Sequence, residues 1–274
     1  MKFWNVLKKI IQIVIAAFPK KSARVIEKVE DVMDKIPTPI IEPVEIPLPT
    51  PSNPVTQVNN SNLVETTPTS SNCYLIDNGH GADDPINQSP VLPDGRIFYE
   101  WKFNRIIARE VVRQLKEKRI ECLLVVPEDN VDNFLKGRVD RANEYQTHRP
   151  KIFISIHANA MPAKFGQWAD TASGIETWYL HKNTESRSLA EIFQRHLVAA
   201  TGWKNRWVKS RPNRQFYVLR KTTMPAIVTE NGFFNHQKQC LELMKPEVQQ
   251  AIADAHVAAI EEIEKNQRVP SLLG

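Results

Sequence analysis

The chain has 274 residues, of which 42% are hydrophobic and 24% are charged, as in an ordinary soluble globular protein. This composition excludes a largely disordered chain, a collagen-like repeat and a protein with several membrane spans. The net charge of +5 permits weak attraction to acidic polymers. The sequence carries no nucleic-acid recognition motif, however, so we expect no nucleic-acid partner. The three cysteines are far apart and form no CxxC pair, so a metal site would have to use histidines and carboxylates.

The N-terminal part of the chain differs in composition from the rest. Residues 1–35 begin with a basic and apolar stretch, too short to span a membrane as a helix, and continue with an amphipathic pattern. They indicate a leader or a membrane-associated segment, with residues 1–18 as the membrane contact. Residues 36–72 are rich in proline, then polar, and contain no Lys or Arg, which is typical of a linker. We therefore predict a folded domain over residues 73–267 and a short tail at 268–274.

In the predicted domain, apolar runs typical of buried strands alternate with helical patterns. Helices are expected at 99–118, 133–148, 184–200 and 246–265. Strands are expected at 73–77, 121–126, 151–156, 175–180 and 226–229, with a short edge strand at 216–219. Strands that alternate with helices predict an α/β domain with a mostly parallel sheet covered on both faces.

Polar residues follow several of the predicted strands. His80 and His157 come after the first and third strands, Glu230 follows the last strand, and Glu100 lies at the start of the first helix. The carboxyl ends of parallel strands form a common edge, where open α/β sheets place their sites, so these four side chains can converge. Two histidines and a carboxylate with an open fourth position are typical of catalytic zinc. A second carboxylate would then act as a general base, and the spacing leaves open which glutamate has which role.

Other residues near this edge are weaker candidates. Asp77 is placed to orient an imidazole by accepting its second N–H group, and Asn159 follows His157 in the same turn of chain. Trp168 lies in the predicted active-site loop, where it would either stack on substrate or pack within its own loop. Arg214 belongs to a basic stretch that would either meet carboxylates of a substrate or form a solvated surface.

Five motifs occur in the order found in a known family: IDNGHGADD, the FYEWKFN helix start, FISIHANA, GIETWYL and MPAIVTENGFFN. Together they resemble the zinc-dependent N-acetylmuramoyl-L-alanine amidases (type 3) of bacterial wall hydrolases and phage endolysins. The resemblance covers about residues 73–265 and implies a single domain with a twisted sheet of about six strands between helices. It also implies one zinc ion bound by His80, Glu100 and His157, with Glu230 as the catalytic glutamate. The implied substrate is peptidoglycan, cut between N-acetylmuramic acid and L-alanine.

Two alternatives stay open beside the amidase. One is a zinc peptidase that cuts within the stem peptide, and the other is an inactive module that binds the wall or regulates another enzyme. The resemblance also fits both a phage lysin and a bacterial remodelling enzyme. The expected location is therefore the cell envelope, with or without a membrane tether, or the host cytoplasm until lysis for a phage lysin.

Overall fold

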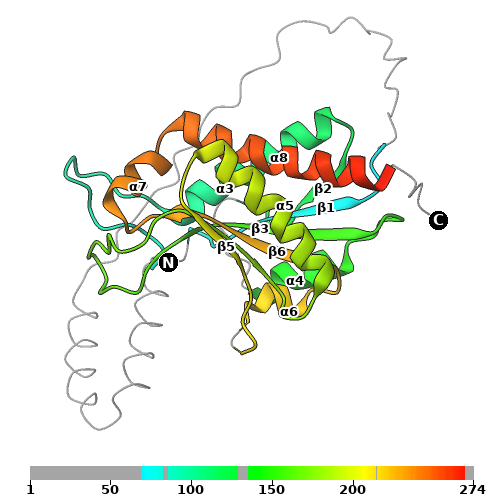
Figure 1. Ribbon diagram of the computed structural model, residues 1–274, viewed down its shortest axis with the longest axis horizontal. Coiled ribbons are helices and arrows are strands. Elements are labelled where there is room, and N and C mark those ends of the chain that lie inside the picture. Colours follow the sequence, from blue (N-terminus) through cyan, green and yellow to red (C-terminus); the bar gives the residue numbers. More distant parts are fainter. Residues whose placement is uncertain (1–68, 83–85, 129–134, 214, 269–274) are drawn as a thin grey trace, which may run out of the picture. The chain divides into compact units, whose positions relative to one another are not determined.

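The computed structural model describes residues 69–82, 86–128, 135–213 and 215–268 (Figure 1). The predicted N-terminal segment and nearly all of the predicted linker and tail lie outside these residues. Within the described part of the chain, no helix has the length and apolar character that crossing a membrane requires.

Six strands form one sheet in the order β2-β1-β3-β6-β4-β5. The strand β4 is antiparallel to β6, and every other neighbouring pair is parallel. This arrangement confirms the predicted α/β domain with a mostly parallel sheet of six strands. The bounds of the strands are β1 (Cys73–Asn78), β2 (Glu121–Leu124), β3 (Lys151–Asn159), β4 (Ile175–Tyr179), β5 (Asn205–Lys209) and β6 (Ala226–Phe233).

Helices cover both faces of the sheet (Figure 1). The long helices α3, α5 and α8 lie over one face, and the short helices α4 and α6 lie over the other. The helix α5 begins after Asn183, whose side chain accepts the N–H of Ser186, and ends at Gly202 in a left-handed conformation. The bounds are α3 (Glu100–Glu117), α4 (Leu135–Glu144), α5 (Thr184–Thr201), α6 (Tyr217–Lys221), α7 (Gln237–Leu243) and α8 (Pro246–Arg268).

The alternation of side chains along the strands determines on which face of the sheet the polar residues at the strand ends lie. Leu75, Phe153 and Val228 belong to the core cluster that includes Val218 and Leu219 of the α6 helix. Because every second residue of a strand points to the same face, the polar residues further along these strands lie on that face as well. The sheet therefore carries its apolar core under α4 and α6 and continues into polar side chains at its carboxyl edge.

Three elements differ from the predictions. The predicted edge strand at 216–219 is wrong, because these residues contribute to the helix α6. The actual edge strand is β5, whose sequence NRWVK is half-buried and lacks the apolar alternation that would reveal it. The helix α7 was not predicted.

The boundary of the domain also differs from the prediction. Residues 69–72, assigned to the linker by composition, pack against the domain, with Ser70 and Asn72 buried.

Candidate active site

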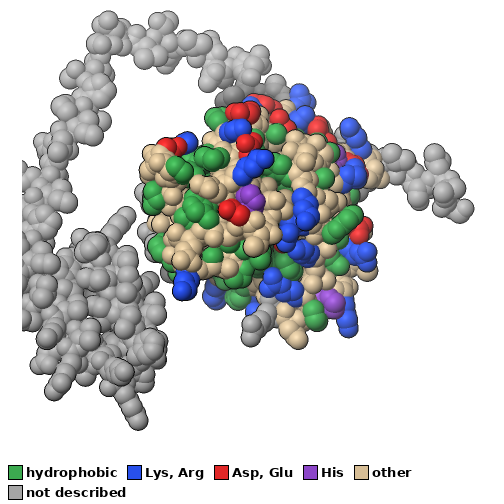
Figure 2. Space-filling model, turned by 60° about the vertical axis from the view of Figure 1, so that its left-hand side comes forward, with side chains coloured by type: hydrophobic (Ala, Val, Ile, Leu, Met, Phe, Trp, Pro, Cys, Tyr) green, Lys and Arg blue, Asp and Glu red, His purple; other side chains and the backbone are tan. Residues whose placement is uncertain are grey.

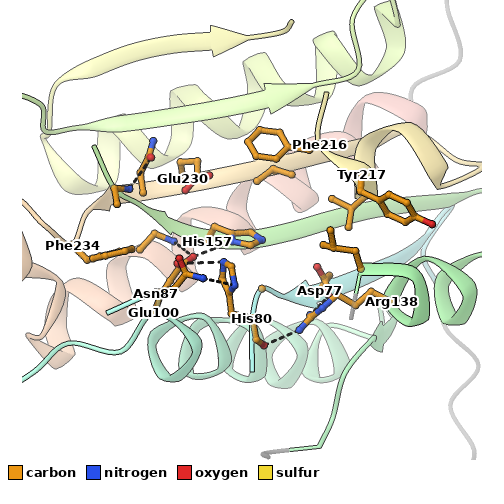
Figure 3. A pocket seen from close by; sticks show the side chains of 17 residues that line it. Asp77, His80, Asn87, Glu100, Arg138, His157, Phe216, Tyr217, Glu230 and Phe234 are labelled. Carbon is orange, nitrogen blue, oxygen red and sulfur yellow. Dashed lines mark hydrogen bonds and ion pairs between the residues drawn. The ribbon is translucent and has the colours of Figure 1, made fainter. Parts of the chain in front are cut away.

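The main cavity of the described domain lies at the carboxyl edge of β1, β3 and β6, on the side of α4 and α6 (Figure 3). It has a volume of about 560 Å³. Leu135 of α4, Tyr217 of α6 and Phe216, the residue before α6, form one wall. The cavity is also lined by six of the residues singled out from the sequence: Asp77, His80, Glu100, His157, Asn159 and Glu230.

His80 sits on a constrained piece of backbone just after β1. Its φ angle is +62°, a left-handed conformation that few residues other than glycine adopt. Two arginines hold this conformation, because Nη1 of Arg105 and Nη2 of Arg138 donate to the carbonyl oxygen of His80 at 2.8 and 2.7 Å. Its imidazole places Nε2 at 3.3 Å from Oε2 of Glu100, while Nδ1 lies 2.9 Å from the amide nitrogen of Asn87.

Glu100 opens the helix α3 and joins the two histidines. Its carboxylate is buried, and Oε1 lies 3.0 Å from Nδ1 of His157. Oε1 also accepts the side-chain amide of Asn104 and the backbone N–H of Ala158, each at 3.2 Å. Burial by itself would raise the pKa of Glu100, but the imidazoles of His80 and His157 and the Asn104 bond lower this pKa below its usual value. Glu100 is therefore held as an anion between two imidazoles.

A chain of hydrogen bonds fixes the ring of His157 from the other side. Ser155 donates its hydroxyl proton to Oδ2 of Asp77 at 2.6 Å, and Asp77 in turn pairs with Nη1 of Arg138 at 2.7 Å. Since the only proton of Ser155 goes to Asp77, its oxygen accepts the Nε2–H of His157 at 3.1 Å. Asp77 thus acts on His157 through Ser155 and does not bond the imidazole directly. The other ring nitrogen, Nδ1, faces Oε1 of Glu100.

The three side chains can hold a metal ion. One ligand atom from each of His80, Glu100 and His157 lies within 4.8 Å of the others, and Figure 3 shows the three pointing toward one another. Nδ1 of His157 lies 3.0 Å from Oε1 of Glu100, so either a proton or a metal ion can join the two atoms. Zinc prefers imidazole nitrogen and carboxylate oxygen ligands, at about 2.0–2.2 Å. The donor set therefore fits zinc.

The close approach of β1 to His157 requires glycine at position 79. A Cβ atom on Gly79 would lie 2.1 Å from Cε1 of the His157 ring, well inside van der Waals contact. The glycine that precedes His80 thus leaves room for the second imidazole, and the ring centroids of the two histidines are 5.0 Å apart.

Glu230 lies across the cavity from the candidate metal centre. It stands in β6 directly opposite His157 of β3, and it is not part of the three-residue group. Its side chain is buried, and Oε2 has no hydrogen-bond partner among the described residues. Burial, followed by the charges of Glu100 and Glu176, raises the pKa of Glu230 well above its usual value, while Arg211 and Lys209 partly oppose this rise.

The remaining predicted residues occupy different places. The side-chain amide of Asn159 donates to Oε2 of Glu176 at 3.1 Å. Trp168 is half-buried and packs against the core under α3, α5 and α8. Arg214 lies outside the described residues.

The structure adds two residues that the sequence analysis did not single out. Ser155 shares a strand face with His157, two positions away, and this spacing could have indicated it. Glu176 stands opposite Glu230, but only the antiparallel pairing of β4 with β6 brings them together. No sequence signal specifies that pairing.

The fold and the site together define an α/β domain with a His–Glu–His candidate metal centre and a further glutamate, Glu230, in the same cavity. Residues 75–262 match the N-acetylmuramoyl-L-alanine amidase family, Amidase_3, and the chain belongs to this family.

Similar proteins agree with this assignment. The chain is 30% identical over 190 residues to the N-acetylmuramoyl-L-alanine amidase LytC of Bacillus subtilis, covering 67% of this chain and 34% of that protein. It is 27% identical over 196 residues to the endolysin of Bacillus phage SPP1, covering 69% of this chain and 64% of the endolysin. The crystal structure of an N-acetylmuramoyl-L-alanine amidase from Clostridium difficile 630 superposes with a TM-score of 0.62 at 28% identity, covering 73% of this chain and all of that one. The matched region thus spans about a third of the length of LytC.

Proposed function

We propose that this chain hydrolyses the amide between the lactyl group of N-acetylmuramic acid and L-alanine in peptidoglycan. The observation that carries the proposal is the pairing of a His–Glu–His group with Glu230 in one cavity of 560 Å³. Family membership supports the choice of bond and of substrate. A domain that only binds the wall would have no use for a buried glutamate that serves neither as a metal ligand nor in an ion pair.

In this proposal His80, Glu100 and His157 hold one zinc ion. When bound there, zinc would act as a Lewis acid that polarises the scissile carbonyl and makes water a sufficient nucleophile near neutral pH. The protein's part is to keep the two imidazoles in the correct tautomers and Glu100 ionised. Arg138, Asp77 and Ser155 do this for His157 through their chain of hydrogen bonds.

Glu230 serves as the proton carrier. Its carboxyl group lines the same cavity as the three candidate ligands, where it is placed to take a proton from attacking water. The raised pKa makes Glu230 a better base than an ordinary glutamate, and it allows the carboxyl group to hold the proton until the amine of L-alanine leaves. The same group thus acts as base and then as acid.

The test is the identity of the products. Purified peptidoglycan is digested with the full chain and with the variant Glu230→Gln, and the released fragments are read by mass spectrometry. We expect new N-terminal L-alanine and intact glycan strands with the wild type, and neither with the variant. Cuts between residues of the stem peptide would show that the chain is a zinc peptidase and not an amidase. Binding to peptidoglycan without any cut would favour the inactive module.

The place of action is proposed from the sequence and the relatives. Residues 1–18, expected to contact a membrane, lie outside the described residues. The endolysin and cell wall amidase relatives support action at the cell envelope, either by a phage lysin or by a bacterial remodelling enzyme. Fractionation of cells that produce the full chain or residues 36–274 would separate a membrane-held protein from a free one.

A further inference from the structure

A group of cations lies beside Glu230 on the α4 and α6 face of the sheet. Glu176 stands opposite Glu230 in the β4–β6 pair. Its carboxylate accepts Nε of Arg206 at 2.6 Å and Nζ of Lys209 at 2.5 Å. Arg211 follows two residues after Lys209, at the end of β5. Arg206 and Lys209 thus share one buried carboxylate, and together with Arg211 they leave an excess of positive charge beside Glu230.

Arg211 is placed to receive an anion. Its guanidinium carbon lies 4.3 Å from the ring centre of Trp178 and 5.7 Å from that of Phe216. Phe216 lines the main cavity. Its contact with the face of the Trp178 ring holds the planar group without using its N–H donors. The side chain is exposed, and among the described residues it has no ion pair with an acid.

Stem peptides offer a matching group, since their residues beyond L-alanine carry carboxylates. We propose that Arg211 binds a carboxylate of the stem peptide, so that the peptide leaves the candidate metal centre over Phe216 toward β5. This inference rests on the proposed function. A guanidinium held flat presents two parallel N–H groups that fit both oxygens of a carboxylate. An amide in the same place offers one acceptor oxygen and no charge. The site therefore favours a free carboxylate after L-alanine over its amide.

The test measures binding without turnover. The full chain carrying Glu230→Gln, loaded with zinc, is titrated by calorimetry with two muramoyl dipeptides. Both have the γ-carboxyl group of the second residue capped as a methyl amide; one carries a free α-carboxylate there (D-glutamate), and the other carries the α-amide (D-isoglutamine). We expect the acid to bind about tenfold more tightly than the amide, as for a charge-assisted pair near the surface. The further substitution Arg211→Ala should bring this ratio close to one, and Arg211→Lys should retain part of it.

The control separates the site from general positive charge. Figure 2 shows more Lys and Arg than Asp and Glu side chains over the lower half of the face turned to the viewer, so charge alone could favour an acid. Arg220 is exposed and also lies over an aromatic ring, 5.6 Å from the centre of Tyr217. Arg220→Ala should leave the tenfold ratio unchanged. Thermal unfolding of each variant checks that it is folded.

Two results would overturn the inference: a tenfold ratio that survives Arg211→Ala, or an equal loss of the ratio in Arg220→Ala. Its failure is distinct from failure of the proposed function. If the wild-type chain cleaves the lactyl amide but the Glu230→Gln chain binds acid and amide alike, the proposed function stands and the Arg211 site does not. If the wild-type chain cleaves nothing, yet the preference for the acid is lost with Arg211→Ala, the Arg211 site stands and the proposed function does not.

Discussion

At the scale of single residues, the hydroxyl of Ser155 links His157 to a buried ion pair. Asp77 and Arg138 are both buried, and Ser155 bonds both Asp77 and the imidazole. Partners of this kind fix the tautomer of a metal-binding histidine and typically change metal affinity by about 10–100-fold.

We therefore expect Ser155→Ala to weaken zinc binding by about tenfold or more, because Nε2 of His157 loses its acceptor. Competition with a chelator of known affinity measures this change. The matched control is Ser188→Ala, which removes an exposed hydroxyl bonded to Thr184 on α5 and should bind zinc as the wild type does. Equal zinc affinities for Ser155→Ala and the wild type would show that the hydrogen-bond chain has no influence on the metal.

His256 gives the domain a pH dependence of stability that is separate from catalysis. It is fully buried, donates from Nδ1 to the carbonyl of Ile252, and accepts the hydroxyl of Thr229 at Nε2. Burial lowers the pKa of His256 to about 4. Between pH 6.5 and about 4 the unfolded chain binds a proton at this residue and the folded chain does not, so stability falls as the pH falls.

We expect the free energy of unfolding to lose about 3 kcal/mol from this residue between pH 7 and pH 4. The variant His256→Gln should show a correspondingly smaller loss over the same range, measured by urea unfolding at several pH values. His148→Gln, which changes an exposed histidine, should keep the slope of the wild type. Parallel curves for His256→Gln and the wild type would contradict this account.

At the scale of elements, Glu264 ties the end of α8 to the start of the sheet. Its carboxylate accepts the backbone N–H groups of Ser71 and Asn72, the side-chain amide of Asn72 and the hydroxyl of Tyr74. The glutamate is buried, so none of these donors finds water if the acceptor is lost.

Glu264→Gln replaces one carboxylate oxygen by an N–H donor that faces other donors. We expect the free energy of unfolding to fall by about 2–3 kcal/mol, the range for hydrogen bonds to a charged group. On the same helix, Glu261→Gln removes only an exposed pair with Lys118 and should cost less than about 1 kcal/mol. Denaturant unfolding of both variants checks the difference, and equal costs would rule out a special role for Glu264.

Elements with strong apolar patterns were predictable from the sequence. The helix α3 buries Phe103, Ile107, Val111 and Leu115, whose four-residue spacing identified it. The strand β5 and the helix α6 were not predictable, because edge strands and short helices carry little periodic burial. Their positions depend on what they pack against, here β4 and the core residue Val218.

The same limit applies to the candidate site. Residues that directly follow parallel strands could be grouped from the sequence, because strand ends share an edge. Contacts across the sheet, such as that of Glu176 with Arg206 and Lys209, depend on the direction of β4 and on a register that no motif encodes.

At the scale of the whole molecule, the folded unit includes residues before β1. The hydroxyl of Ser70 accepts the N–H of Glu121, its carbonyl accepts Nε of Arg149, and the next two residues bond Glu264. A boundary drawn from composition at residue 73 would remove all of these bonds.

We expect a fragment of residues 69–268 to unfold at a higher temperature than one of residues 73–268. The difference should be several degrees, since about 2 kcal/mol shifts the midpoint of a domain of this size by roughly 4–8 °C. Calorimetry of the two fragments measures it. Identical midpoints would mean that residues 69–72 add nothing to the stability of the domain.

The central claim is that His80, Glu100 and His157 hold the metal while Glu230 performs the proton transfer. The most direct test measures zinc content and release of N-terminal L-alanine side by side for the wild type, Glu230→Gln and His80→Ala. We predict one zinc per chain for the wild type and for Glu230→Gln, product from the wild type alone, and neither zinc nor product from His80→Ala. Loss of zinc in Glu230→Gln, or product formation by that variant, would contradict the division of roles.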